Sequence, residues 1–103
     1  MLYLLQTQLH QPENMSAESF NQAWAEQSKA AMGAVEKGVI KNIWKVAGER
    51  SFLVIADVPD HDTLDRVVSA LPFNKTMGSG FEVKITPLRE YMPFAEELMA
   101  ATK

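Results

Sequence analysis

The segment from Gly38 to Pro59 constrains the fold most, because its apolar residues do not keep to one face of a sheet. Strand side chains alternate between two faces, so a sheet covered on one side alternates apolar with polar residues. Leaving large apolar side chains in water costs roughly 1.5 to 3 kcal/mol each. Both faces of the predicted strand 51 to 58 therefore need a cover: helices of the chain on one side and a second copy of the sheet on the other. The two faces carry, respectively, Phe52, Val54 and Ala56, and Leu53 and Ile55.

The composition is that of an ordinary globular protein. The chain has 103 residues, 47% of them hydrophobic, which predicts a single domain over residues 1 to 103. It contains no cysteine, so thiolate chemistry and disulfides are excluded. A net charge of −3, with scattered lysines and arginines, argues against nucleic acid and membrane surfaces as partners. Residues 1 to 5 lack the basic lead of a secretion signal, so we expect a cytoplasmic protein.

Periodicity and turn residues predict four strands, over residues 2–9, 39–47, 51–58 and 81–86. They predict two main helices, over residues 16–37 and 60–71. We expect a loop with a mobile glycine tip at 73–80, and a helix at 92–101 within a C-terminal extension, 88–103. The order β-α-β-β-α-β is that of the ferredoxin-like α+β fold, an antiparallel four-stranded sheet with both helices on one face. Its other face is bare in a monomer, in agreement with the two apolar faces of the strand.

Gln27 is the first candidate for a functional site. At about 100° per residue it lies near the centre of the apolar stripe of the first helix, whereas Glu26 points away from that stripe. A buried amide without partners costs roughly 1 to 3 kcal/mol, so Gln27 should meet a polar group of a strand, a trapped water or a ligand. A satisfied core amide and a pocket residue both stay open as interpretations.

Trp44 is the second candidate, on a strand face that alternation predicts to carry Ile40 and Asn42 as well. A tryptophan there suits the core, a subunit interface or a ligand wall. The two histidines, His10 and His61, have no suitably spaced ligand partners, so we predict no metal site. The chain has no nucleophile motif or phosphate-binding glycine loop, so any catalysis must be proton transfer or substrate positioning.

Four groups of residues resemble the pattern G-x5-W-[RK]-x-A-G, DVP and LP of muconolactone delta-isomerases: Gly38, Trp44 to Gly48, Asp57 to Pro59, and Leu71-Pro72. The resemblance covers roughly residues 1 to 73. It implies a ferredoxin-like subunit that pairs through its sheet into a dimeric α+β barrel, with dimers joining into larger homo-oligomers. It also implies a 1,3-proton shift on muconolactone without a cofactor, in the catabolism of aromatic compounds.

The resemblance further implies an acidic base on the inward face of the first helix, where this chain has Gln27. An amide does not accept a proton at neutral pH, and Glu26 could replace it only after a rotation of the helix by about a quarter turn. We therefore expect Gln27 to donate a hydrogen bond to a carbonyl or enolate oxygen. Tyr3, Asn42 and Trp44 are expected to line the same pocket, which would take a small lactone or aromatic-derived acid.

Two other functions stay open from the residues alone. The first is a cofactor-free monooxygenase or cyclase of the dimeric α+β barrel group, because Asn42 and Trp44 lie two residues apart on one strand. The second is a homo-oligomer that binds a small ligand without catalysis, because no base is evident. The sequence does not decide whether the protein is an enzyme.

Overall fold

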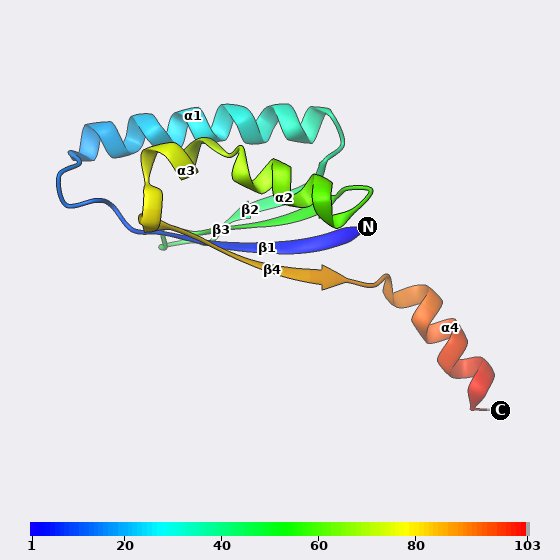
Figure 1. Cartoon of the computed structure of the whole chain (residues 1–103). Helices are drawn as coiled ribbons and strands as arrows, with labels where there is room; N and C mark the ends of the chain where they lie inside the picture. The colour runs from blue at the N-terminus through cyan, green and yellow to red at the C-terminus, as the bar shows by residue number, and fades with distance from the viewer. Residues whose placement is uncertain (103) are drawn as a thin grey trace.

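The computed structural model describes residues 1–102 and contains a four-stranded antiparallel sheet of order β2-β3-β1-β4. The strands are β1 (Leu2–Leu9), β2 (Ile40–Lys45), β3 (Phe52–Asp57) and β4 (Phe81–Leu88). The helices are α1 (Ala17–Glu36), α2 (His61–Ser69), α3 (Pro72–Thr76), the 3-10 turn η1 (Gly78–Gly80) and α4 (Tyr91–Ala101). Helices α1 to α3 cover one face of the sheet (Figure 1). The predicted ferredoxin-like α+β fold is confirmed.

The core lies between the sheet and the helices that cover it. Strands β1 and β3 alternate strictly, so that every second side chain points into this core. Phe73 is its most enclosed residue, at 0% exposure, and its ring lies 5.3 Å from that of Phe81 and 6.0 Å from that of Trp24. The buried core side chains of β1, β3 and α1 include Tyr3, Leu5, Leu9, Phe52, Val54, Ala56, Phe20 and Ala23.

The segment between α2 and β4 is mostly helical. The prediction of a loop at residues 73–80 was therefore wrong. Instead α3 begins with Pro72, whose fixed backbone angle suits the first turn of a helix. Winding the chain there turns Phe73 into the core, and the gain from burying this ring outweighs the turn-forming tendency of the segment. The carbonyl oxygen of Gly80 accepts the backbone N–H of His10 at 2.7 Å, which fixes the end of the segment to β1.

A β-bulge in β2 changes which of its side chains share a face. The pairing with β3 shifts between Ile40 and Asn42, so that Lys41 is the extra residue. Ile40 keeps to the helix-covered face, while Asn42 and Trp44 lie on the other face with their β3 partners. The prediction that Ile40 and Trp44 share a face was therefore wrong, because an inserted residue inverts the alternation beyond it.

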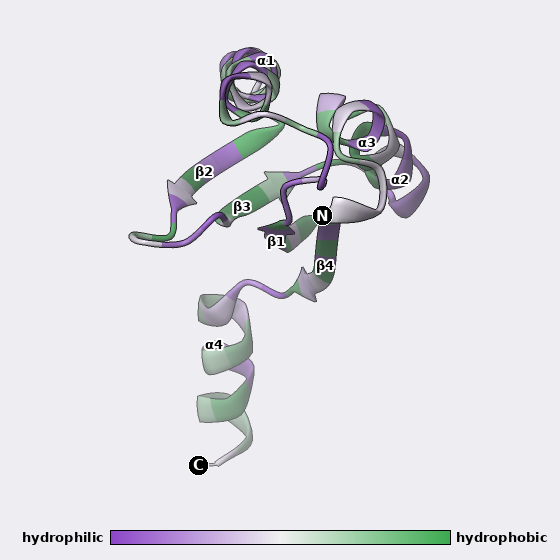
Figure 2. Cartoon of the chain, turned by 90° about the vertical axis from the view of Figure 1, so that its left-hand side faces the viewer, coloured by the Kyte–Doolittle hydropathy of each residue, from purple (hydrophilic) through white to green (hydrophobic). Residues whose placement is uncertain are grey.

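Helix α4 stands apart from the rest of the subunit. Strand β4 leads away from the sheet into α4, which projects on the side of the uncovered sheet face (Figure 2). The subunit is therefore elongated, with extents of 61 × 26 × 22 Å and a radius of gyration of 16.5 Å. A compact chain of this length has a radius of gyration of about 13 Å. The predicted C-terminal helix is confirmed.

Among residues 1–102, no helix combines the length and the apolar character that crossing a membrane requires.

Candidate functional site

Helix α1 holds Gln27 against the sheet. The helix begins after Ser16, whose side-chain oxygen accepts the backbone N–H of Ser19 at 3.0 Å and so satisfies one free donor of the first turn. From there the helical period turns Phe20, Ala23 and Gln27 inward. Gln27 is 3% exposed, which confirms that its amide faces the interior.

The two ends of the Gln27 amide have different surroundings. The oxygen Oε1 accepts the backbone N–H of Phe73, in the first turn of α3, at 3.1 Å. The partner is thus the backbone of a segment predicted to be a loop, rather than a strand side chain or a water. Within residues 1–102 the nitrogen Nε2 makes no hydrogen bond, and protein atoms do not seal it off. Its two N–H groups can therefore donate to a molecule beside it.

A narrow apolar cavity, here named the inner cavity, adjoins Gln27 between α1 and the sheet. It has a volume of about 50 Å³. A wider pocket of about 250 Å³, here named the mouth, opens next to it. Ligand sites in proteins begin at about 300 Å³, so the two together suit a small molecule. Both are lined by Gln27, Ala31, Ile43 and Phe52.

Lys45 places a positive charge at the mouth. Its Nζ donates to the carbonyl oxygens of Val46 at 3.3 Å and Glu49 at 2.8 Å. It also lies 5.9 Å from the centre of the Trp24 ring, which forms another wall of the mouth. A carboxylate in the mouth would meet this ammonium group. Sequence reasoning gave Lys45 no role, although the basic position of the G-x5-W-[RK] pattern is the signal that could have found it.

Thr7 forms part of the floor of the inner cavity and is fully satisfied there. Its Oγ1 donates to the carbonyl oxygen of Phe52 at 2.9 Å and accepts the backbone N–H of the same residue at 3.0 Å. Thr7 therefore ties β1 to β3 and has no donor left for a ligand. Gln27 is consequently the side chain that supplies free N–H groups to the inner cavity.

Glu26, the alternative base, lies outside both the inner cavity and the mouth. Its carboxylate is on the exposed side of α1, 3.6 Å from the Nζ of Lys29. The neighbour of Gln27 thus faces the solvent, as the helical period predicts, and the observed α1 does not bring it toward the sheet.

The other predicted pocket residues lie elsewhere. Tyr3 is buried toward one end of β1, and its hydroxyl group is hydrogen-bonded to Nδ1 of His61. Asn42 and Trp44 lie on the uncovered sheet face, where Trp44 is 53% exposed. Within one subunit the structure thus separates these three residues from Gln27. The described residues contain no group of three or more side chains suited to bind a metal ion.

A ferredoxin-like sheet with a small cavity under its first helix, and one free amide donor in that cavity, is typical of a small-molecule-binding α+β protein. The family model of muconolactone delta-isomerase matches residues 1–93. The chain therefore belongs to the muconolactone delta-isomerase family.

Individual relatives agree with this assignment. A muconolactone delta-isomerase of Cupriavidus pinatubonensis is 29% identical over 91 residues, which are 88% of this chain and 95% of the relative. A crystal structure of muconolactone isomerase matches with a TM-score of 0.74 at 20% identity, over 87% of this chain and 90% of that one. A second solved structure is the 5-chloro-2-hydroxyhydroquinone dehydrochlorinase of Burkholderia phenoliruptrix AC1100 in complex with 2,5-dihydroxybenzoquinone. It matches with a TM-score of 0.68 at 15% identity, over 87% of this chain and 95% of that one. At such identities the two solved structures show the fold alone.

Proposed function

We propose that the protein binds a small lactone or related acid in the inner cavity and its mouth, and stabilises the enolate form of this ligand through Gln27. One observation carries the proposal: Oε1 of the buried Gln27 is held by Phe73, while Nε2 is left free beside the cavity. Removing a proton next to a carbonyl group places negative charge on the carbonyl oxygen. A fixed N–H donor in an apolar cavity stabilises that charge more strongly than water does.

Lys45 supports a ligand that carries a carboxylate as well as a carbonyl group. The inner cavity is almost entirely apolar apart from Gln27 and Thr7, so a negative charge would stay outside it, in the mouth. The ammonium group of Lys45 lies at the mouth, where it can pair with that charge. Muconolactone, after which the relatives are named, combines a lactone carbonyl with a carboxylate and fits this arrangement.

A proton shift also needs a base, which the cavity lacks. No aspartate, glutamate or histidine of residues 1–102 lines the inner cavity or the mouth. The proposal therefore assigns ligand binding and enolate stabilisation to the present side chains, and assigns rapid turnover only to a variant with a carboxylate at position 27.

The test compares the wild-type protein with Gln27→Glu. The glutamate keeps an acceptor for the N–H of Phe73 but loses the Nε2 donor. We expect muconolactone to bind the variant at least about 10-fold more weakly, since the hydrogen bond from Nε2 to its carbonyl oxygen is lost. We expect its isomerisation to be at least about 100-fold faster, because a base enters the cavity. Titration calorimetry measures binding, and ultraviolet absorbance measures turnover.

The matched control for this experiment is Glu26→Gln, which makes the reverse exchange on the exposed side of the same helix. We expect it to leave both binding and turnover unchanged. Wild-type protein that does not bind the lactone, or equal binding by all three proteins, would overturn the proposal.

We also propose that two copies of the chain pair through their uncovered sheet faces. These faces carry the large apolar side chains of Leu4, Leu53, Ile55 and Trp44, which helices of the same subunit do not cover. Packing two such faces together removes them from water. A location in the cytoplasm, larger rings of dimers and activity without a cofactor stay predictions.

A further inference from the structure

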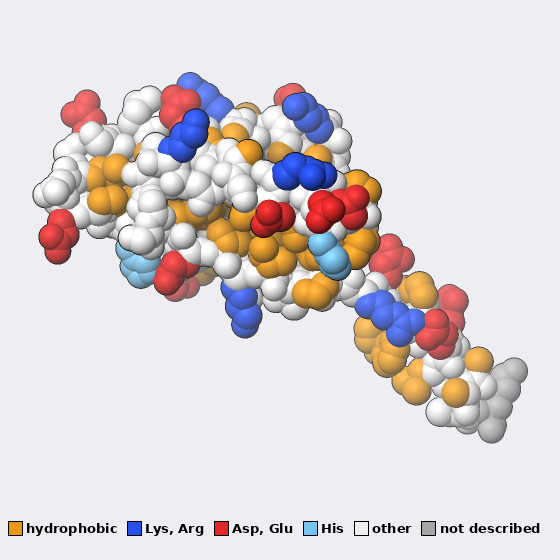
Figure 3. Space-filling model, viewed as in Figure 1, with side chains coloured by type: hydrophobic (Ala, Val, Ile, Leu, Met, Phe, Trp, Pro, Cys, Tyr) orange, Lys and Arg blue, Asp and Glu red, His pale blue; other side chains and the backbone are white. Residues whose placement is uncertain are grey.

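A second opening adjoins the inner cavity, on the other side of α1 from the mouth. It is a groove of about 530 Å³ between α1 and the segment from α2 to α3, here named the outer groove. Figure 2 shows these two parts side by side on the sheet, and Figure 3 shows apolar side chains at the surface in the region of α2 and α3. Both spaces are lined by Ala30, Ala34, Val39, Val67 and Leu71. A molecule in the inner cavity can therefore extend into the outer groove.

Small residues of α1 keep the outer groove open. Within residues 1–102, α1 packs mainly against α3 and β2, and not against α2. Toward α2 it carries Ala30 and Gly33, and a Cβ atom added at Gly33 would meet no described atom of another segment within 4 Å. Glycine is also a poor helix former, so neither packing nor helix formation requires it at this position. The chain itself thus leaves the space beside Gly33 unfilled.

The inner cavity connects the mouth with the outer groove beneath α1. Ala31 of the mouth and Ala30 of the outer groove point about 100° apart, and Gln27 points between them toward the sheet. The residues of the mouth from 24–31 and those of the groove from 30–37 are centred about six residues apart, which is about 9 Å along a helix. A ligand that reaches from one opening to the other therefore passes Gln27.

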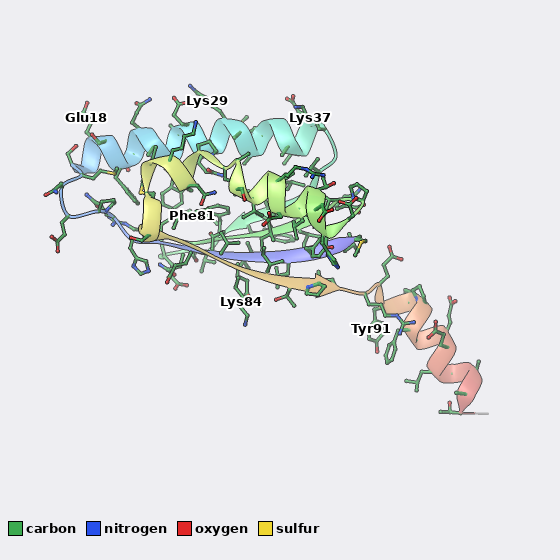
Figure 4. All side chains as sticks on the ribbon, in the orientation of Figure 1. Glu18, Lys29, Lys37, Phe81, Lys84 and Tyr91 are labelled. Atoms are coloured by element: carbon green, nitrogen blue, oxygen red, sulfur yellow. The ribbon has the colours of Figure 1, made fainter. Side chains whose placement is uncertain are left out.

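The two openings differ in charge. At the mouth, Lys45 donates to two carbonyl oxygens, so the third N–H of its ammonium group is left for a carboxylate. The outer groove is lined by apolar residues apart from Lys37, which lies at the end of α1 on the side away from the sheet (Figure 4). Helices α1 and α2 both end beside this groove, and the partial negative charge of a helix C-terminus disfavours a carboxylate there. A bound acid therefore places its carboxylate in the mouth and its apolar end in the outer groove.

We infer that the outer groove binds an alkyl chain of the ligand, so that the preferred ligands are lactone acids with an alkyl substituent. The inference rests on the function proposed above and names the class of ligand for the same site. The carboxylate of the ligand meets Lys45, its lactone carbonyl meets Nε2 of Gln27, and its alkyl chain passes beneath α1 to the space beside Gly33. Burial of each methylene group strengthens binding about fourfold.

The first test uses two paraconic acids, which are γ-lactones with a carboxylate on the ring, one with a methyl and one with a hexyl substituent. Titration calorimetry measures their dissociation constants with the wild type, with Gly33→Phe, which fills the outer groove, and with the matched control Ala25→Phe. Ala25 is exposed on α1 and lies outside the residues that line the mouth, the inner cavity and the outer groove.

We expect the wild type and Ala25→Phe to bind the hexyl acid at least about 30-fold more tightly than the methyl acid. For Gly33→Phe we expect a ratio below about fivefold, because the phenyl ring takes the place of the chain. An equal ratio for Gly33→Phe and the wild type, or a wild type that binds the methyl acid and gains nothing from the hexyl chain, would overturn this inference alone. A protein that binds neither acid would overturn the proposed function as well.

The second test locates the alkyl chain directly, in a crystal structure of the wild-type protein with the hexyl acid. We expect electron density for the chain between α1 and α2, in contact with Gly33 and Val67, and density for the carboxylate beside Lys45. A hexyl chain that lies in the mouth or in the solvent would overturn the inference.

Discussion

The two faces of the sheet are built from the same strands and differ in what covers them. On the helix-covered face, Val54 is 3% exposed and Ala56 is 2% exposed. On the uncovered face, the neighbouring residues Leu53 and Ile55 are only partly buried, and Trp44 is 53% exposed. The apolar character of the strands is thus similar on both sides, while burial is not. The difference shows that a single copy of the chain covers one of the two apolar faces that its strands present.

The polar groups of the two faces differ in the same way. Below the helices each buried polar group has a defined partner: Thr7 is bonded twice to Phe52, and Gln27 is bonded to Phe73. The free Nε2 of Gln27 is the exception, and it lies at the inner cavity. A group that departs from an otherwise complete pattern of hydrogen bonds is the best indicator of a binding site on this face.

The largest expected effect comes from placing the same charge on each face in turn, at adjacent positions. Val54→Asp buries an unpaired carboxylate in the core, and we expect it to unfold the protein, with a loss above about 4 kcal/mol. Ile55→Asp should leave the subunit folded but raise the dimer dissociation constant about 100-fold or more. Urea unfolding and sedimentation equilibrium measure the two effects. An Ile55→Asp protein with the dimer dissociation constant of the wild type would show that the uncovered face is not the interface.

A smaller loss of stability is expected when a hydrogen-bonded side chain is removed from the helix-covered face. Thr7→Val keeps the shape of the side chain but leaves the N–H and carbonyl groups of Phe52 without this partner. We expect a loss of about 1 to 3 kcal/mol in the free energy of unfolding, measured in urea. The control is Asn21→Val on the exposed side of α1, expected to change stability by less than about 0.5 kcal/mol. Equal losses in the free energy of unfolding for the two variants would show that the hydrogen bonds of Thr7 do not stabilise the helix-covered face.

The smallest expected effect concerns Asp60, which caps α2, one of the covering helices. Hydrogen bonds from the side chain and the backbone N–H of Thr63 lower the pKa of Asp60 below its ordinary value of 3.8. The folded state thus favours the carboxylate. The contribution of the Asp60 carboxylate to the free energy of unfolding is present above pH 3.8. It is lost as the pH falls through the lower pKa of the folded state.

Asp60→Asn should keep the cap, because asparagine is also a good N-cap, but remove this part of the pH dependence. Unfolding in urea at pH 5 and at about pH 3 measures the difference between the two proteins. An identical pH dependence in both would show that the cap does not stabilise the carboxylate form.

The sequence predicted the fold well because its signals are local and repetitive. The alternation in β1 and β3, the period of α1 and the glycines at strand and helix ends all follow from the geometry of single elements. The family pattern from Gly38 to Pro72 indicated the same architecture. The inward direction of Gln27 also followed from the helical period alone.

Two features depended on contacts between distant segments, and sequence reasoning missed them. The loop predicted at 73–80 winds into α3 because Phe73 finds a space between α1 and the sheet. The bulge at Lys41 inverts the face of Asn42 and Trp44, and nothing in the alternation of β2 announces it. Whether Asn42 and Trp44 lie on the same side of the sheet as Gln27 therefore depends on the register of β2 against β3, which the sequence does not give.

By itself, the sequence determined that the sheet is apolar on both faces and that Gln27 points inward from the first helix, because both depend only on periodicity and position. Only the tertiary structure decided that Oε1 of Gln27 is already occupied and that Nε2 is free, and that α4 leaves its own subunit. These properties depend on how segments far apart in the chain meet, and local propensity does not fix that.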